Sequence, residues 1–432
     1  MSILVDPGLL REITAFQLGR RCGDWTDGDL AIQLRHLDLI RYRIKHLHFD
    51  AIDPLLTTAT LDVVVLLYEH GHRCSVQAFD TTAARGGPVS LLEWLVAHGS
   101  DKCTRRALDD AASNGHLDVV LWLLESEKVV VVQDIESGHP IDWSLAIDGA
   151  AAGGHLAVLQ ALVNCKDGLT ATTGAMDKAA ANGHVEVLEY LHTHRSEGFT
   201  AKAVHAAASN GHLAVVQWLS ANTTPHHKDM WDSRVMDGAA AAGHLDVVKW
   251  LDAHRREWCS PMAMSLAGAH GHVHVMEFLL AHRRELCTYD ALDWAASVGQ
   301  LASVVWLHEH SAMLRLEVSV VAMDEAAGHN FLDVVEFLHY HRTEGCTATA
   351  MDNAAANGHL AMVRWLHTNR KEGCTEWAIC LAALGGHLEV VQFLWTSRPE
   401  CQGVDALDAA RLYAGERCRV RTWIDERLSS LR

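Results

Sequence analysis

The sequence predicts an all-α solenoid, in which helix-turn-helix units stack one after another along most of the 432 residues. Three observations predict this architecture. The string Gly-His-Leu-x-Val-Val-x-Trp-Leu recurs, most of its copies lie 28 residues apart, and an alanine-rich segment precedes each copy. A period of about 20 to 50 residues is typical of repeat proteins whose units cannot bury their apolar faces alone.

The motif glycine marks each repeat, and its spacing shows where the chain departs from regularity. Ala59 replaces it in a degenerate first copy and Asn330 replaces it once later, which predicts about 11–12 repeats. Three intervals are longer than the rest, and they contain insertions at residues 125–144, 222–233 and 311–319. Such insertions are either binding loops or tolerated drift. The motif glycines are Gly87, Gly115, Gly154, Gly183, Gly211, Gly243, Gly271, Gly299, Gly358 and Gly386.

Residues 346–373 show how one repeat folds. Thr347 can cap a helix by accepting a hydrogen bond from a backbone N–H of its first turn. Residues 348–356 are rich in alanine, which has the highest helix propensity. Gly358 ends that helix because glycine adopts the left-handed conformation readily. The apolar stripe of a second helix follows at Leu360, Val363, Trp365 and Leu366.

This unit resembles the ankyrin repeat. The segment Ala-Ala-Ala-Asn-Gly-His-Leu is similar to the ankyrin core Ala-Ala-x-x-Gly-His-Leu-x-Val-Val, and matching copies cover roughly residues 50–400. The family unit has about 33 residues, so the 28-residue unit here is of a short type, with short or absent β-hairpin fingers. The family's Thr-Pro-Leu-His is replaced by forms such as the segment 349–352, Thr-Ala-Met-Asp. The resemblance implies an ankyrin-like helical repeat solenoid that binds other proteins.

The ends of the chain differ from the array at residues 51–401. Residues 1–50 lack the motif and are predicted to form two helices, either an N-terminal cap or an F-box-like adaptor that recruits a ubiquitin ligase. Residues 402–432 keep the helix-turn-helix spacing with a more polar core, which predicts a degenerate C-terminal capping repeat.

Charge and composition narrow the class of partner. The chain has 36 Lys and Arg against 54 Asp and Glu, a net charge of −18. It lacks the basic clusters that nucleic-acid binding needs, and anionic membranes are disfavoured for the same reason. We therefore expect a neutral or basic protein or peptide partner and a monomeric chain. The first residues lack a secretory signal pattern, which predicts a cytoplasmic or nuclear protein.

Seven aspartates occupy one repeat position, and their spacing predicts a structural role. Stacked helices lie about 8–10 Å apart, so equivalent carboxylates form a ladder, whereas a retaining glycosidase pair needs about 5–5.5 Å. We expect each carboxylate to accept a hydrogen bond from a loop N–H or from a Gly-His imidazole. The residues are Asp109, Asp148, Asp177, Asp237, Asp293, Asp324 and Asp352.

The histidines and cysteines also follow the repeat. One Gly-His histidine per repeat cannot converge on a metal ion, and we expect these side chains to hydrogen-bond the backbone at the turn. The cysteines before the first helices are expected to stay reduced, because the spacing between repeats exceeds what a disulfide spans. The sequence therefore predicts no catalytic residue, no cofactor and no metal site.

The ankyrin resemblance implies that partners contact the first helices and loops, at positions just before Gly-His. These positions are mostly small, whereas protein hot spots favour Trp, Tyr and Arg. Either an extended peptide binds this surface, or the insertions together with residues 1–50 form the contact surface instead. Trp231, in the second insertion, is a further candidate. The candidate residues before Gly-His are Ser113, Asn114, Asn182, Ser209, Asn210, His270, Asn357 and Leu384.

Overall fold

The computed structural model describes residues 61–71, 74, 77–98, 105–125, 144–165, 172–223, 229–255, 260–282, 288, 290–415 and 419–431. Every regular element in these ranges is a helix, which confirms the all-α prediction. The chain divides into two compact units, residues 1–206 (unit 1) and 207–432 (unit 2), with the boundary inside helix α14 (Ala201–Ser209).

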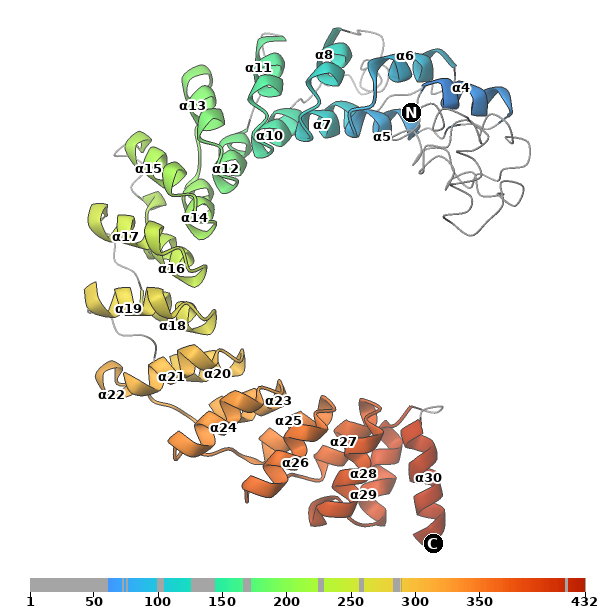
Figure 1. Ribbon diagram of the computed structural model, residues 1–432, viewed down its shortest axis with the longest axis vertical. Helices are drawn as coiled ribbons and strands as arrows, with labels where there is room; N and C mark the ends of the chain where they lie inside the picture. Colours follow the sequence, from blue (N-terminus) through green and yellow to red (C-terminus); the bar gives the residue numbers. More distant parts are fainter. Residues whose placement is uncertain are drawn as a thin grey trace, which may run out of the picture. The chain divides into compact units, whose positions relative to one another are not determined.

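Unit 1 stacks pairs of antiparallel helices, each pair being one repeat (Figure 1). The first helices of successive pairs pack against one another, α5 on α7, α7 on α10 and α10 on α12. The second helices α6, α8, α11 and α13 each pack on the first helix of their own pair. The helices are α4 (Leu61–Glu69), α5 (Ala78–Ala84), α6 (Val89–His98), α7 (Arg105–Ser113), α8 (Leu117–Glu125), α10 (Ser144–Ala152), α11 (Leu156–Cys165), α12 (Thr173–Ala181) and α13 (Val185–His194).

Unit 2 continues the same pairing (Figure 1). Its first helices form a continuous packed row from α16 to α29. The helices are α15 (Leu213–Asn222), α16 (Ser233–Ala241), α17 (Leu245–His254), α18 (Met262–Ala269), α19 (Val273–His282), α20 (Ala291–Ser297), α21 (Leu301–Glu309), α22 (Ser311–Leu314), α23 (Val321–Gly328), α24 (Leu332–His341), α25 (Ala348–Ala356), α26 (Leu360–Asn369), α27 (Trp377–Leu384), α28 (Leu388–Ser397), η6 (Pro399–Cys401), α29 (Val404–Tyr413) and α30 (Arg419–Leu431).

The core consists of small residues on the first helices and branched residues on the second. In α25, Ala350, Ala354 and Ala355 are buried, and in α26, Val363 and Leu366 are buried. Alanine allows the first helices to approach closely, so the repeat core is thin and each pair depends on its neighbours for burial. Short loops without strands, such as residues 342–347, connect the pairs where the structure describes them.

The turn glycines have the predicted left-handed conformation, with one correction. Gly358 has φ 77°, and Asn330 takes the same conformation at φ 65°. In the first complete repeat, however, the left-handed residue is Gly86 (φ 69°) and not the predicted Gly87. Pro88 follows Gly87 and directly precedes α6. Proline suits this position because it has no backbone N–H that would be left unpaired at the start of the helix.

The structure describes some of the insertions and chain ends but not others. The insertion at residues 311–319 adds the short helix α22, whereas most of residues 125–144 and all of residues 1–50 lie outside the described ranges. The cap and adaptor hypotheses for residues 1–50 stay predictions. Residues 402–432 contain α29 and α30. None of the helices in the described ranges combines the length and apolar character that crossing a bilayer requires.

Candidate protein-binding surface

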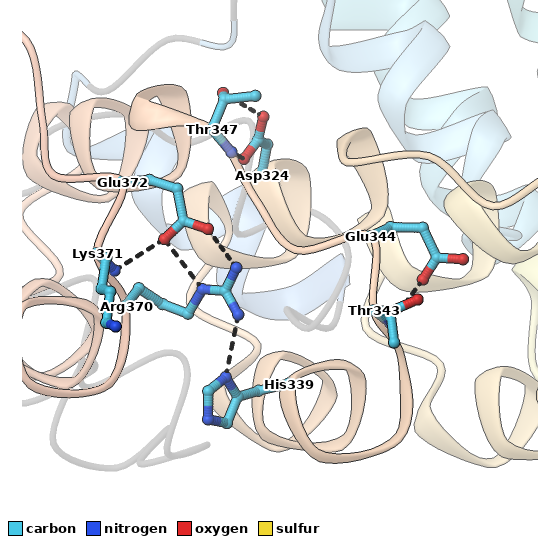
Figure 2. Close-up of polar contacts among 8 residues, drawn as sticks. All are labelled: Asp324, His339, Thr343, Glu344, Thr347, Arg370, Lys371 and Glu372. Atoms are coloured by element: carbon cyan, nitrogen blue, oxygen red, sulfur yellow. Dashed lines mark hydrogen bonds and ion pairs between the residues drawn. The ribbon is translucent and has the colours of Figure 1, made fainter.

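The repeated aspartates hold the cap of the following repeat. Asp324 accepts hydrogen bonds from the backbone N–H of Thr347 at 2.7 Å and from its hydroxyl at 2.6 Å (Figure 2). The Thr347 hydroxyl also accepts the N–H of Thr349 at 3.1 Å, which confirms the predicted cap. Of the two expected donors, the loop N–H is therefore the one found. The same arrangement joins Asp177 to Thr200, Asp237 to Ser260, Asp293 to Ser319, and Asp352 to Thr375.

Three of these carboxyl groups, on Asp237, Asp293 and Asp352, are buried in a way that changes their acidity. Burial raises the pKa of Asp237, Asp293 and Asp352 above the ordinary value, although hydrogen bonds from the Ser or Thr partner act in the opposite direction. In each of these carboxylates, both oxygen atoms accept hydrogen bonds from a single Ser or Thr at the start of the next repeat. This arrangement supports the structural role that the sequence predicts for the aspartate ladder.

The Gly-His histidines also join neighbouring repeats. His155 Nε2 lies 3.2 Å from the carbonyl oxygen of Ser113, and His184 Nε2 lies 3.0 Å from that of Ala152. The predicted bond to the backbone is confirmed, and the carbonyl belongs to the preceding repeat. A Cβ on Gly115 would lie 2.5 Å from the His155 ring, so the turn also requires glycine for space. In the described ranges, no three His, Cys, Asp or Glu side chains are placed to hold a metal ion.

An Arg-x-Glu motif closes the loop that leads into the next repeat. Figure 2 shows Arg370 paired with Glu372, while its other nitrogen, Nη1, lies 3.3 Å from His339 Nδ1. Burial alone would raise the pKa of Glu372, but hydrogen bonds from Arg370 and the backbone outweigh it and hold the pKa below its ordinary value. Arg195 with Glu197, Arg342 with Glu344 and Arg398 with Glu400 form the same pair.

The cysteines before the first helices need one correction. Cys374 and Cys401 occupy corresponding positions in successive repeats, and their Sγ atoms lie 3.6 Å apart. Repeat spacing was expected to keep all such cysteines apart, but it brings these two sulfurs into contact. Both are free thiols in the structure.

Helix α27, one of the first helices of unit 2, carries exposed apolar side chains. Trp377 is 52% exposed, Leu384 is 61% exposed, and Leu381 between them is half-buried. Their spacing of four and three residues places them on one side of the helix. The ring of Tyr413, 40% exposed at the end of α29, lies 6.1 Å from that of Trp377. We call Trp377, Leu381, Leu384 and Tyr413 the C-terminal apolar patch.

The aromatic residues of the second helices stack on histidines one turn later. The rings of Trp250 and His254 lie 4.8 Å apart at 13°, and those of Phe278 and His282 lie 4.2 Å apart at 20°. Trp306 is 7% exposed. The Trp and Phe rings are partly or fully buried, as the sequence predicts for a packing stripe, whereas His254 and His282 are exposed.

Two family models match the chain. Residues 147–229 match the model for ankyrin repeats in three copies, and residues 81–124 and 322–367 match the model for ankyrin repeats in many copies. These matched segments are ankyrin repeats. Comparison with the curated proteins returns no match.

Solved structures include similar helical repeats. The human ASB11 ankyrin repeat domain is 20% identical, with a TM-score of 0.34, and the match covers 46% of this chain and 96% of that chain. The pentatricopeptide repeat protein PPR10, in complex with an 18-nt psaJ RNA element, is 13% identical with a TM-score of 0.38, over 93% of this chain and 68% of that chain. Neither likeness is close enough to indicate a partner.

Several predicted contact residues have a structural task within the ankyrin repeats. The side-chain amide of Asn114 donates to the carbonyl of Ala84 at 2.8 Å. Asn182 donates to Ala152 at 2.7 Å, and Asn357 donates to Gly328 at 2.9 Å. Each of these asparagines ties its repeat to the preceding one, a role that the sequence interpretation missed.

The remaining predicted contacts differ in exposure. Ser113, Asn210 and His270 are exposed and Ser209 is half-buried, while Leu384 belongs to the C-terminal apolar patch. Trp231 is 4% exposed, so the prediction that it forms a contact surface was wrong. Its indole N–H donates to the Thr223 hydroxyl at 3.1 Å, and the Arg255 guanidinium lies 3.7 Å from its ring centroid.

Proposed function

We propose that this ankyrin-repeat protein is a non-catalytic scaffold that binds partner proteins or peptides, and that the C-terminal apolar patch is a principal contact. The observation that carries the proposal is the exposure of Trp377 and Leu384 on α27. That helix is apolar on all sides, as Trp-Ala-Ile-Cys-Leu-Ala-Ala-Leu. A helix of this kind is normally buried on all sides, so a partner is the natural cover for its open face.

The repeat fold does not require apolar residues at the exposed positions of α27. In the preceding first helix, α25, the positions equivalent to Trp377, Leu381 and Leu384 are Thr349, Asn353 and Ala356. The array therefore tolerates polar or small residues on this face. Tryptophan and tyrosine are enriched among residues that dominate binding energy at protein interfaces, which supports a contact role for the patch.

Charge around the patch supports a neutral or basic partner. Glu376 precedes Trp377 and is exposed, and Asp405 is exposed on α29. The whole chain carries a net charge of −18. A partner that presents an apolar side chain flanked by Lys or Arg would bury the patch and could pair with these carboxylates, and its association would weaken with added salt.

Affinity capture with matched variants tests the proposal. The full chain, the double variant Trp377→Ala/Leu384→Ala, and Leu121→Ala would each be used to capture partners from the native cell. Leu121 is 40% exposed on α8 in unit 1 and serves as the control for loss of an exposed leucine. We expect a stoichiometric partner to be retained by the full chain and by the control, and to be lost from the double variant.

The size of the loss decides the outcome. Truncation of a hot-spot residue costs about 2 kcal/mol or more, so the affinity for a purified partner should fall at least about 30-fold. A partner that binds the double variant as tightly as the full chain would show that the patch is not its contact. A truncated chain lacking residues 1–50 tests the adaptor hypothesis separately, because partners lost with that deletion alone would locate a recruitment segment.

A further inference from the structure

The junction between the last array repeat and the C-terminal helix pair contains a buried pair of thiols. Cys374 precedes α27 and is 5% exposed, and Cys401 precedes α29 and is 0% exposed. Their Sγ atoms are 3.6 Å apart. One repeat earlier, the corresponding Cys346 is hydrogen-bonded with Arg370.

A shorter loop explains why only this junction, among those described, brings two thiols together. The loop before Cys374 reads Arg-Lys-Glu-Gly-Cys, with Gly373 in the left-handed conformation at φ 78°. The loop before Cys401 reads Arg-Pro-Glu-Cys and lacks the glycine. The 3-10 turn Pro399–Cys401 takes its place and positions Cys401 against Cys374.

The surroundings distinguish the two sulfurs. The hydrogen bond with Cys401 lowers the pKa of Cys374, and the Arg398 guanidinium adds to this effect, although burial opposes it. The same hydrogen bond and burial raise the pKa of Cys401, which therefore keeps its proton. Burial raises the pKa of Cys346 to about 11, so that thiol stays protonated at neutral pH. The thiolate is the reactive form of cysteine, which makes Cys374 the nucleophile of the pair.

We infer that Cys374 and Cys401 form an oxidative modification site, at which hydrogen peroxide converts the dithiol to an intramolecular disulfide. The Cys374 thiolate attacks one peroxide oxygen, the O–O bond breaks, and sulfenic acid and hydroxide form. The Cys401 sulfur then attacks the Cys374 sulfur, the S–O bond breaks, and a second hydroxide leaves. The two thiol protons convert both hydroxides to water, so two thiols and one peroxide give one disulfide and two waters.

Geometry and position both allow this reaction. A disulfide needs an S–S distance of about 2.05 Å, so the sulfurs must approach each other by about 1.5 Å. The α29–α30 pair packs on α27 and α28, and local opening of such a pair gives a small oxidant access to the buried sulfurs. The new bond would link the loop before α27 to the loop before α29 and hold the C-terminal pair onto the array.

Peptide mapping of the full chain tests the site. The reduced protein would be treated with equimolar hydrogen peroxide, free thiols would be alkylated, and the chain would be cut after glutamate. Cleavage after Glu372, Glu376, Glu400 and Glu416 places Cys374 in peptide 373–376 and Cys401 in peptide 401–416. We expect these two peptides to be joined by a bond that dithiothreitol breaks.

Matched variants and a stability measurement complete the test. Cys374→Ser and Cys401→Ser should each abolish the linkage, while Cys380→Ser, which removes a nearby buried thiol, should keep it. Oxidised wild-type protein should unfold at a temperature several degrees higher than the reduced protein, and Cys401→Ser should show no such shift. Recovery of both cysteines alkylated or as sulfinic acids, or equal linkage of Cys374 to Cys346 or Cys380 in folded wild-type protein, would overturn the inference.

Discussion

Asp352 accepts two hydrogen bonds from Thr375, which lies 23 residues later in the next repeat. The backbone N–H of Thr375 donates at 2.8 Å and its hydroxyl at 2.6 Å. The same hydroxyl accepts the N–H of Trp377 at 3.1 Å. Because a hydroxyl has one proton, it donates to Asp352 and accepts from the helix. One side chain therefore caps α27 and joins it to α25.

Removal of the carboxylate should loosen this junction. Asp352→Ala leaves the Thr375 hydroxyl and N–H without their charged acceptor, at a cost of about 2 kcal/mol. In a repeat array the loss is local, so amides of α27 should exchange about 30-fold faster with deuterated water. Glu336→Ala, on an exposed position of α24, is the control. Unchanged protection of α27 in Asp352→Ala would show that packing alone holds the junction.

The junction should also respond to pH. Burial raises the pKa of Asp352 above 3.8, while hydrogen bonds from Thr375 lower it. Thr375→Val removes the hydroxyl, so the pKa in the folded state should rise further. The folded variant then keeps its proton to a higher pH than the unfolded chain, and its stability falls as pH rises through that pKa.

The variant should therefore show a larger stability deficit at neutral pH than in acid below the ordinary carboxyl pKa. Thermal unfolding across pH, with an NMR titration of Asp352 in both proteins, measures the two quantities. A deficit that is the same at every pH would contradict the idea that the hydroxyl favours the ionised carboxylate.

The local features of the repeat were predictable because each depends on neighbours in the sequence. Alanine-rich segments, the Thr347 cap and the left-handed Gly358 follow from propensity, capping and backbone freedom. The aspartate ladder was predicted in part. The repeat period shows that an aspartate recurs at one position, but it does not show which group donates a hydrogen bond to the carboxylate. Contacts that depend on how repeats stack, such as the amide of Asn357 on Gly328, had no local signal.

Features that break the repeat were the hardest to interpret from sequence. The apolar string of α27 resembles a fully buried helix, so the exposure of Trp377 appears only when its neighbours are placed. The missing glycine before Cys401 is visible in the sequence, but its effect on the sulfur position depends on loop geometry. Trp231 lies in an insertion, where exposure is the usual expectation, yet Arg255 covers its ring.

Trp231 should therefore affect stability and not binding. Trp231→Ala removes a buried aromatic ring and its contact with Arg255, at a cost of about 3–5 kcal/mol. Trp231→Phe keeps most of the volume and should be milder. Hydrogen exchange of α15 and α16 measures the effect, and partner capture by the folded fraction should be unchanged. Full protection of these helices together with loss of a partner would restore the surface role.

Two turn glycines with nearly the same backbone conformation allow two destabilising effects of an added Cβ to be measured separately. One is the strain of the left-handed conformation, and the other is the steric clash with a neighbouring side chain. Gly358 has φ 77° and Gly386 has φ 76°, but a Cβ on Gly358 would lie 2.4 Å from His387 Nδ1, whereas nothing lies within 4 Å of a Cβ on Gly386. Gly386→Ala should cost about 1–2 kcal/mol, the penalty for the left-handed conformation alone.

Gly358→Ala should cost clearly more, because the His387 ring must also move. Denaturant unfolding of Gly358→Ala, His387→Ala and the double variant forms a cycle in which the excess should disappear from the double variant. Additive losses would mean that the ring yields without cost, and that the recurrent glycine serves the backbone conformation alone. A negative interaction energy would instead show that Gly358 makes room for the ring of His387 in the next repeat.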